Sequence, residues 1–269
     1  MRLLFVGDVV GRAGRTCLIE RLPELRRRLR LDAVVVNAEN AAGGFGLTPP
    51  IAADLFAAGA DALTMGNHTW DQRDLIGHID QEPRILRPLN MPPGAPGKGS
   101  LVLDAGRGRR LLVLQVLGRL FMAQSDDPFR ALEAELRRHV MGGGVQAILV
   151  DVHAEATSEK QALGHLLDGR VSLVVGTHTH IPTADARILS NGTAYLTDAG
   201  MTGVYDSVIG MDKSLSLQRW QSPLPGPRMQ PAEGSATLCG VFVETDDRTG
   251  LARHVVPVRE GGDLAASAP

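Results

Sequence analysis

The stretch VVVNAENAAGG, residues 34–44, runs from three valines into an asparagine, a glutamate and a glycine-rich turn. A continuous β-branched run of this kind predicts a strand that is covered on both faces, as in a parallel βαβ unit. The strand ends by presenting Glu39 and Asn40 side by side. In open α/β sheets ligands bind beyond the carboxyl ends of the strands, so these two side chains mark the first candidate site.

The rest of the chain repeats this alternation of apolar runs and amphipathic segments. An Asn-Gly turn within 186–200 predicts a β-hairpin, and 236–258 predicts a second one around Asp-Asp-Arg-Thr-Gly. Hairpins added to strands covered on both faces imply two packed sheets. The Pro- and Gly-rich segment 83–108 is predicted to be a loop that closes over something. Strands are expected over 3–6, 33–36, 61–65, 109–118, 146–155 and 171–180, and helices over a stretch ending at 30, 49–60, 127–140 and 158–169.

Length and composition favour one α/β domain over residues 1–269, with residues 260–269 as a frayed tail. The chain is 43% hydrophobic, which is enough for a sizeable core. Lys and Arg total 28 against 30 Asp and Glu, and the net charge of -2 argues against a protein that holds long nucleic acid. The arginines within 26–30 are interpreted as a solvated helix face. A small anionic substrate remains allowed, because a local cation can attract it.

The cysteines and the apolar runs indicate the cellular compartment of the protein. Cys17 and Cys239 are the only cysteines, and without a C-x-x-C spacing they indicate neither a disulfide framework nor a zinc ribbon. The apolar run before Gly7 is too short for a signal peptide, and no stretch approaches 18 uninterrupted apolar residues. We therefore expect a cytoplasmic protein without membrane contact, and a homo-oligomer is left open.

Polar side chains stand at the ends of five predicted strands. Singly, each has an ordinary explanation: an N-cap for Asp8, a turn for Asn67, and a satisfied half-buried imidazole for His153. His178 and His180 are expected to point to the same side of an extended segment, as two metal ligands would. Together these groups are costly to bury unpaired, which favours a shared site. The set is Asp8, Glu39, Asn40, Asn67, His68, His153, His178 and His180.

The composition of this set predicts its chemistry. Apart from His68, its three imidazoles, two carboxylates and two amides suit iron, manganese or zinc better than magnesium. The ligands are too many for one tetrahedral site, so a two-metal centre is the more natural interpretation. Two ions about 3.5 to 4 Å apart can share a bridging carboxylate and a bridging hydroxide and clamp the attacking and leaving oxygens at phosphorus. The pattern therefore predicts hydrolysis of phosphate esters.

Five blocks in this order resemble the signature of calcineurin-like metallophosphoesterases over residues 1–185. Two departures narrow the resemblance: Val10 stands where the usual D-x-H motif has its histidine, and Glu39 is the acid of the second block. With AGGFG (42–46) and DAGMTGVYDSVIGMDK (198–213), the chain is similar to the YmdB-type 2',3'-cyclic-nucleotide phosphodiesterases along nearly its whole length. The blocks are GD (7–8), NAEN (37–40), GNH (66–68), His153 and GTHTH (176–180).

The resemblance implies a four-layer α-β-β-α sandwich of two mixed β-sheets flanked by helices. It also implies two divalent or trivalent transition metal ions per chain, with iron preferred over manganese or zinc. Glu39 would bridge the two ions, and His68 would be the general acid. The first ion would be held by Asp8, Glu39, Asn40 and His180, and the second by Glu39, Asn67, His153 and His178.

The mechanism implied by the resemblance is attack on a small phosphodiester by a metal-bridging hydroxide. His68 would then protonate the leaving ribose oxygen. Gly43 and Gly44 could contact a phosphate or form a flexible turn, and Met201, Thr202 and Tyr205 could line the substrate side or pack the second sheet. Two alternatives stay open: a phosphatase or nuclease on the same metals, and a regulatory RNA- or protein-binding module with vestigial activity.

Overall fold

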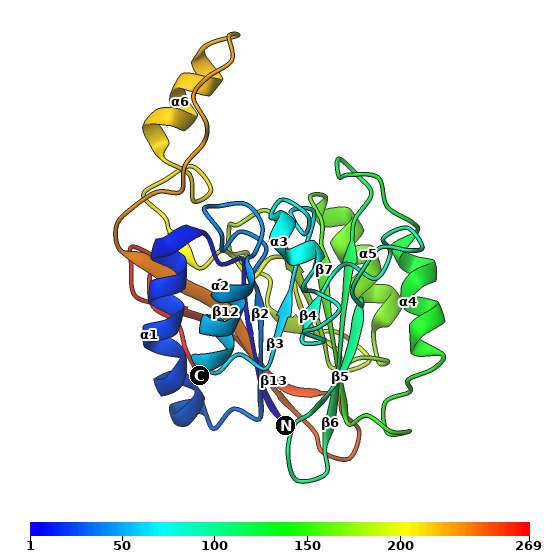
Figure 1. The fold of residues 1–269 in the computed structure, drawn as a ribbon. Helices are drawn as coiled ribbons and strands as arrows, with labels where there is room; N and C mark the ends of the chain where they lie inside the picture. Colours follow the sequence, from blue (N-terminus) through cyan, green and yellow to red (C-terminus); the bar gives the residue numbers. More distant parts are fainter.

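Two β-sheets lie face to face in the computed structural model, which describes residues 1–269, and helices cover their outer sides (Figure 1). The first sheet has the order β11-β12-β1-β2-β3-β4, with β13 paired to β12, and the second has the order β5-β6-β7-β8-β10-β9. The strands are β1 (Arg2–Val6), β2 (Ala33–Asn37), β3 (Ala62–Thr64), β4 (Ile85–Leu86), β5 (Ser100–Asp104), β6 (Arg110–Leu117), β7 (Ala147–His153), β8 (Leu173–Thr177), β9 (Arg187–Ile188), β10 (Ala194–Leu196), β11 (Gly203–Val204), β12 (Ala236–Thr245) and β13 (Ala252–Glu260).

Six helices complete the architecture. α1 and α2 lie against the first sheet, and α4 and α5 lie against the second (Figure 1). α3 is a single turn near the carboxyl edge of the first sheet, and α6 projects from the body of the molecule (Figure 1). The helices are α1 (Gly11–Leu29), α2 (Pro49–Ala57), α3 (Arg73–Ile76), α4 (Pro128–Leu136), α5 (Thr157–Leu167) and α6 (Lys213–Gln221).

Alternate side chains of β2 enter different cores, which explains the valine run. Val34 and Val36 belong to the core that includes Leu22 of α1, whereas Val35 shares the core between the sheets with Leu149 of β7. A third core joins α4 and α5 to the outer face of β6, β7 and β8. A strand that is covered on both faces needs apolar residues at every position. These layers confirm the α-β-β-α sandwich.

Both sheets are mixed, as the resemblance implied. β1, β2, β3 and β4 run parallel, and so do β6, β7, β8 and β10. The two predicted hairpins are confirmed: β9 and β10 pair antiparallel, with Ala194 opposite Ile188, and β12 and β13 pair antiparallel along most of their length. The parallel strands bring their carboxyl ends to one edge of the molecule.

The segment 83–108 was predicted to be a loop, and this was wrong. β4 adds to β3 in parallel, and β5 pairs antiparallel with β6, with Leu101 opposite Val113. The prolines and glycines are concentrated between Leu86 and Ser100. Because prolines and glycines dominate the composition of this segment, the pattern analysis missed the two short strands at its ends.

The carboxyl-terminal segment had been expected to fray beyond Arg259. β13 continues to Glu260, and the chain then returns so that Ser267 exchanges two backbone hydrogen bonds with Arg259, at 3.0 and 2.7 Å. The hydroxyl of Ser267 also donates to the carbonyl of Pro257 at 2.8 Å. These bonds hold the tail against the edge of β13.

α6 belongs to an arm that extends from the body, and the sequence analysis did not predict this helix (Figure 1). The Asp212 side chain caps it by accepting from the backbone N–H groups of Ser214 and Leu215. Ser216 is its one buried residue, and Trp220 is 83% exposed. A helix without a buried apolar stripe leaves no periodic signal, so pattern analysis could not find it.

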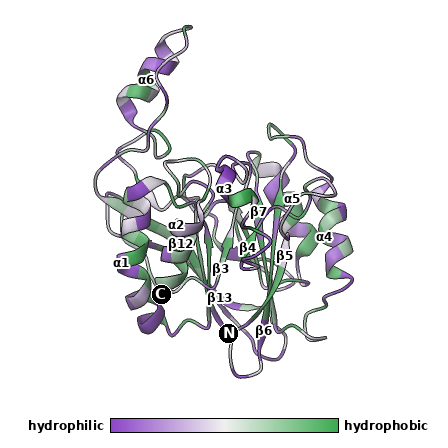
Figure 2. Ribbon diagram, in the orientation of Figure 1, coloured by the Kyte–Doolittle hydropathy of each residue, from purple (hydrophilic) through white to green (hydrophobic).

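Hydropathy follows the layers, since the strands are mostly hydrophobic and the helices mix both kinds of residue (Figure 2). No helix combines the length and the apolar character needed to cross a membrane.

Lys160 and Asp198 form a buried ion pair, with 2.8 Å between Nζ and Oδ2 and almost no exposure of either side chain. We expect Lys160→Met to destabilise the protein by about 3 to 5 kcal/mol, because it leaves the Asp198 carboxylate buried without its cation. Urea unfolding would measure the change. Lys213→Met is the matched control, because its pair with Asp206 is exposed and should contribute less than about 1 kcal/mol. Equal losses of stability in the two variants would contradict the greater importance of the buried pair.

Candidate metal centre

The polar strand ends converge where the carboxyl edges of the two sheets meet. Glu39 follows β2 of the first sheet, His153 ends β7 of the second, and His178 follows β8. One possible ligand atom from each of these three lies within 4.8 Å of the others. Glu39 and His153 are fully buried, and 2.9 Å separates Oε1 of Glu39 from Nε2 of His153.

Two more side chains direct their polar atoms at the same nitrogen of His153. Oδ1 of Asn67 is 3.0 Å from Nε2 of His153, and Nδ1 of His178 is 3.1 Å from it. Glu39, Asn67, His153 and His178 are thus brought together. They are the four residues expected to hold the second ion.

A hydrogen-bond relay fixes the state of the His153 ring. Thr177 donates its hydroxyl hydrogen to Oδ1 of Asp151 at 2.7 Å, so Oγ1 is left to accept from Nδ1–H of His153 at 2.8 Å. Nε2 of the neutral ring then carries a lone pair. When the ring is neutral, this lone pair faces the oxygens of Glu39 and Asn67, and a metal ion satisfies such an arrangement.

Asp8, Asn40 and His180 lie beside this cluster. Oδ1 of Asp8 and Oδ1 of Asn40 are both buried without a hydrogen-bond partner. Nε2 of His180 is 3.9 Å from Oδ1 of Asp8, while its Nδ1 is bonded to the carbonyl of Ile209 at 2.8 Å. A buried acceptor without a partner is costly, so these two orphaned oxygens fit a bound cation.

The pKa values indicate a site that attracts positive charge. Burial raises the pKa of Glu39, but the adjacent His153 more than reverses this and brings it to about 2. Burial lowers the pKa of His153, while Glu39 and then Asp8 raise it to about 9. For His178, burial and the neighbouring His153 lower the pKa to about 3, so its ring is neutral. The carboxylates therefore favour a cation next to Nε2 of His153, whether a proton or a metal ion.

His178 and His180 reach the site by a different route from the one predicted. β8 ends at Thr177, and the two histidines have φ angles of 95° and 66°, so the segment is not extended. Asp8 accepts from the backbone N–H of His178 at 3.3 Å, and Asp198 accepts from that of Thr179 at 3.2 Å. These buried carboxylates stabilise a backbone conformation that costs energy elsewhere, as is common at functional sites.

His68 stands at the mouth of the site rather than within the cluster. Its backbone N–H donates to Oε2 of Glu39 at 3.0 Å, and its Nδ1 is 2.8 Å from Oδ2 of Asp71. The side chain is about one quarter exposed and packs edge-on against Phe45. Because Asp71 engages Nδ1, Nε2 is the nitrogen left for a ligand.

A cavity of about 660 Å³ opens onto the cluster. The expected substrate residues Met201, Thr202 and Tyr205 do not line it: the hydroxyl of Tyr205 donates to the carbonyl of Met201 at 3.0 Å and lies 3.3 Å from the carbonyl of His180. Sequence analysis missed several residues that do line the cavity. Among these, Glu155 carried a usable signal, since it lies two residues beyond His153. The lining includes Glu39, Asn40, His68, Glu155, His178, His180, Ile209, Arg219 and Trp220.

The sequence model of the YmdB-like proteins matches residues 4–258, which is most of the chain. The chain belongs to the YmdB-like protein family. Two related proteins are similar in sequence to this chain over most of its length. The 2',3'-cyclic-nucleotide 2'-phosphodiesterase of Bacillus subtilis is 49% identical over 93% of both chains, and a putative phosphatase/phosphodiesterase of Mycoplasma pneumoniae is 36% identical over 93% of this chain and 89% of its own.

Solved structures of similar fold cover nearly the whole chain. A hypothetical protein from Thermus thermophilus has a TM-score of 0.91 at 42% identity, covering 98% of this chain and all of its own. A novel phosphatase from Mycoplasma pneumoniae has a TM-score of 0.88 at 34% identity, over 98% and 94%. A sulfate thiohydrolase from Thermus shares the fold alone, at 11% identity and a TM-score of 0.54.

Gly66 leaves the space in which the cluster forms. A Cβ atom at this position would lie 2.2 Å from Oε2 of Glu39 and 2.5 Å from Nε2 of His153. We therefore expect Gly66→Ala to lower the metal retained per purified chain at least tenfold, because Glu39 and His153 must move apart. Elemental analysis would measure this. Gly77→Ala is the control, because a Cβ there meets nothing within 4 Å, and equal metal in both variants would contradict the prediction.

Proposed function

We propose that this chain hydrolyses small phosphodiesters, above all 2',3'-cyclic nucleotides, at a two-metal centre. The observation that carries the proposal is the group of acceptor atoms from Glu39, Asn67, His153 and His178, with the orphaned oxygens of Asp8 and Asn40 beside it. The identity of 49% to a 2',3'-cyclic-nucleotide 2'-phosphodiesterase supports the substrate class. That name also favours cleavage at the 2' oxygen, with the 3'-monophosphate as product.

The proposed ligand sets share Glu39. Asp8, Glu39, Asn40 and His180 would hold one ion, and Glu39, Asn67, His153 and His178 the other. Their mixture of imidazole, carboxylate and amide favours iron, with manganese or zinc as alternatives. Bound ions would supply a deprotonated water as the nucleophile and neutralise charge on the phosphoryl oxygens.

The protein's own groups orient the ligands and move the proton. The Asp151–Thr177 relay holds Nδ1 of His153 and keeps Nε2 free for coordination. His68 projects from the cavity wall with Nδ1 held by Asp71, so Nε2–H can protonate the leaving ribose oxygen. The low net charge and a cavity of about 660 Å³ suit a small substrate rather than a long nucleic acid. The proposal places the enzyme in the cytoplasm, where the buried thiols of Cys17 and Cys239 stay free.

A general phosphatase is the second candidate, because the Mycoplasma relatives carry that word in their names. The two activities separate on bis-nitrophenyl phosphate, a diester, and nitrophenyl phosphate, a monoester. The diesterase proposal expects a higher kcat/KM for the diester and for 2',3'-cyclic nucleotides. A clear preference for the monoester would reject it in favour of a phosphatase.

The acid role of His68 predicts a dependence on the leaving group. His68→Ala should lower kcat for a 2',3'-cyclic nucleotide by about 10²- to 10⁴-fold, because a ribose alkoxide needs a proton as it leaves. A nitrophenyl diester, whose leaving group needs no proton, should lose less than about tenfold. His254→Ala, on the exposed side of β13, serves as the control. Equal losses on both substrates would exclude the acid role.

The bridging role of Glu39 predicts a change in metal content. Protein purified without added metal should hold two ions per chain, and Glu39→Gln should reduce this number and remove turnover, because the neutral amide cannot bridge two cations. Elemental analysis together with the cyclic-nucleotide assay tests both. Glu133→Gln removes a surface carboxylate paired with Arg170 and should change neither. Unchanged metal content in Glu39→Gln would refute the bridge, and a cellular phenotype that survives loss of turnover would favour the binding-module alternative.

A further inference from the structure

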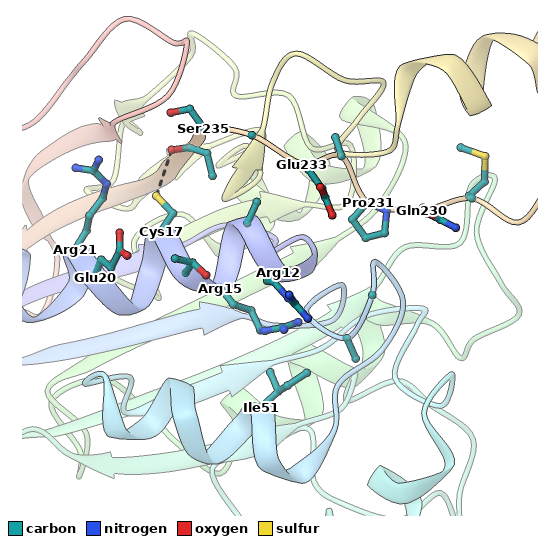
Figure 3. A pocket seen from close by; sticks show the side chains of 18 of the residues that line it. Arg12, Arg15, Cys17, Glu20, Arg21, Ile51, Gln230, Pro231, Glu233 and Ser235 are labelled. Carbon is teal, nitrogen blue, oxygen red and sulfur yellow. Dashed lines mark hydrogen bonds between the residues drawn. The ribbon is translucent and has the colours of Figure 1, made fainter.

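A second cavity, of about 1120 Å³, lies beside the first turns of α1 (Figure 3) and is also lined by residues of the glycine-rich loop. Its walls are the first turns of α1, the chain segment 228–236 and the loop residues Ala42 and Gly43. We call it the arginine pocket, after the four arginines that line it. These are Arg12, Arg15, Arg21 and Arg228.

The arginine pocket adjoins the catalytic cavity through shared structure. Met229 lines both cavities. The loop between them holds Asn40 on its inner side, where Nδ2 donates to the carbonyl of Gly44 at 3.0 Å. Gln72 fixes the same loop by donating to the carbonyl of Phe45 at 2.7 Å. One ligand could therefore extend from the metal centre past this loop.

The arginines of the pocket lack acidic partners. Arg12 and Arg15 point into the pocket from α1 (Figure 3), and Arg15 donates to the carbonyl of Ala41. None of the four forms an ion pair within the chain, whereas Arg26 on the same helix pairs with Asp61 at 2.7 Å. Two carboxylates, Glu20 and Glu233, also line the pocket, so its formal charge is positive.

The two arginines nearest the loop repel each other. Burial, and then the adjacent Arg12, lowers the pKa of Arg15, while Asp54 opposes this. Like charges held together without a carboxylate between them gain stability when an anion binds. Gly43, with a φ of 63° and open space where a Cβ would stand, exposes its backbone to the same pocket. Guanidinium groups bind carboxylates and phosphates in bidentate geometry, and the proposed phosphodiester substrate makes phosphate the fitting anion.

We propose that the arginine pocket binds the next phosphate of a short oligoribonucleotide whose terminal 2',3'-cyclic phosphate occupies the metal centre. This rests on the proposed function and adds a substrate class to it. RNA cleavage by its own 2' oxygen generates such ends: the 2' oxygen attacks phosphorus, the 5' oxygen leaves and takes a proton, and the cyclic diester remains. Water then opens the ring to a monophosphate. The chain thus acts after a transesterifying cleavage of RNA.

Steady-state kinetics with matched substrates tests this. Wild-type protein should show a kcat/KM at least tenfold higher for a di- or trinucleotide ending in a 2',3'-cyclic phosphate than for the mononucleotide with the same base. Each added phosphate contact should make the slope of log kcat/KM against log salt more negative by about 0.7. The double variant Arg12→Gln/Arg228→Gln should reduce the preference to less than threefold. Arg27→Gln, an exposed residue of α1 outside the pocket, should retain it.

Three results would overturn the proposal: no preference in the wild type, an unaltered preference in the double variant, or an equal loss in Arg27→Gln. Added inorganic phosphate distinguishes a free anion from a substrate phosphate. If millimolar phosphate changed mononucleotide turnover in wild type but not in the double variant, the pocket would be a regulatory site instead.

The arginine pocket can be tested even if the chain does not hydrolyse cyclic nucleotides. If no cyclic nucleotide were hydrolysed, binding of a labelled trinucleotide 3'-phosphate would still test the pocket by fluorescence anisotropy. Affinity that the double variant weakens at least tenfold would support the pocket alone, and equal affinity would reject it.

Discussion

The carboxylate of Asp151 is the interaction that joins the two sheets behind the site. Its Oδ2 accepts from Oγ1 of Thr64 at 2.6 Å and from Nδ2 of Asn37 at 3.2 Å, both from the first sheet, while its Oδ1 accepts from Thr177 of the second. Burial raises the pKa of Asp151 to about 7, against the effect of these contacts. A carboxylate so fully enclosed constrains the register of four strands at once, because a shift of any of them would leave a buried oxygen unpaired.

That constraint fixes the polar ends of β2, β3, β7 and β8 relative to one another. The sheets pack through apolar side chains, and such contacts tolerate small displacements of the strands. Hydrogen bonds have a narrower range of geometry, so they fix the positions of the strand ends more closely. Glu39 and His153 come from different sheets and meet at 2.9 Å. The candidate metal-binding group therefore forms only where the two sheets meet in this register.

Much of this could be predicted from the chain alone. Period and composition identified the strands whose valines fill two cores, and the polar residues at their ends identified the cluster. The relay could not be predicted, because Asp151 and Thr177 look like ordinary strand residues until the sheets are paired. The left-handed backbone at His178 and His180 depends on contacts with Asp8 and Asp198, from distant parts of the chain. Short strands flanked by prolines, and a helix with only one buried residue, lack the periodic signal that such prediction needs.

The arm that carries α6 forms part of a cavity wall, and it also places a fluorescent side chain there. The chain has two tryptophans: Trp70 packs against the core beside α1 and α2, and Trp220 is 83% exposed on α6, where it lines the cavity that opens onto the cluster of Glu39 and His178. Their emission should differ, since one indole is largely shielded from water and the other is hydrated. A nucleotide base that stacks on Trp220 would quench the red-shifted component alone. Ligand occupancy can thus be followed in the unlabelled protein, without turnover.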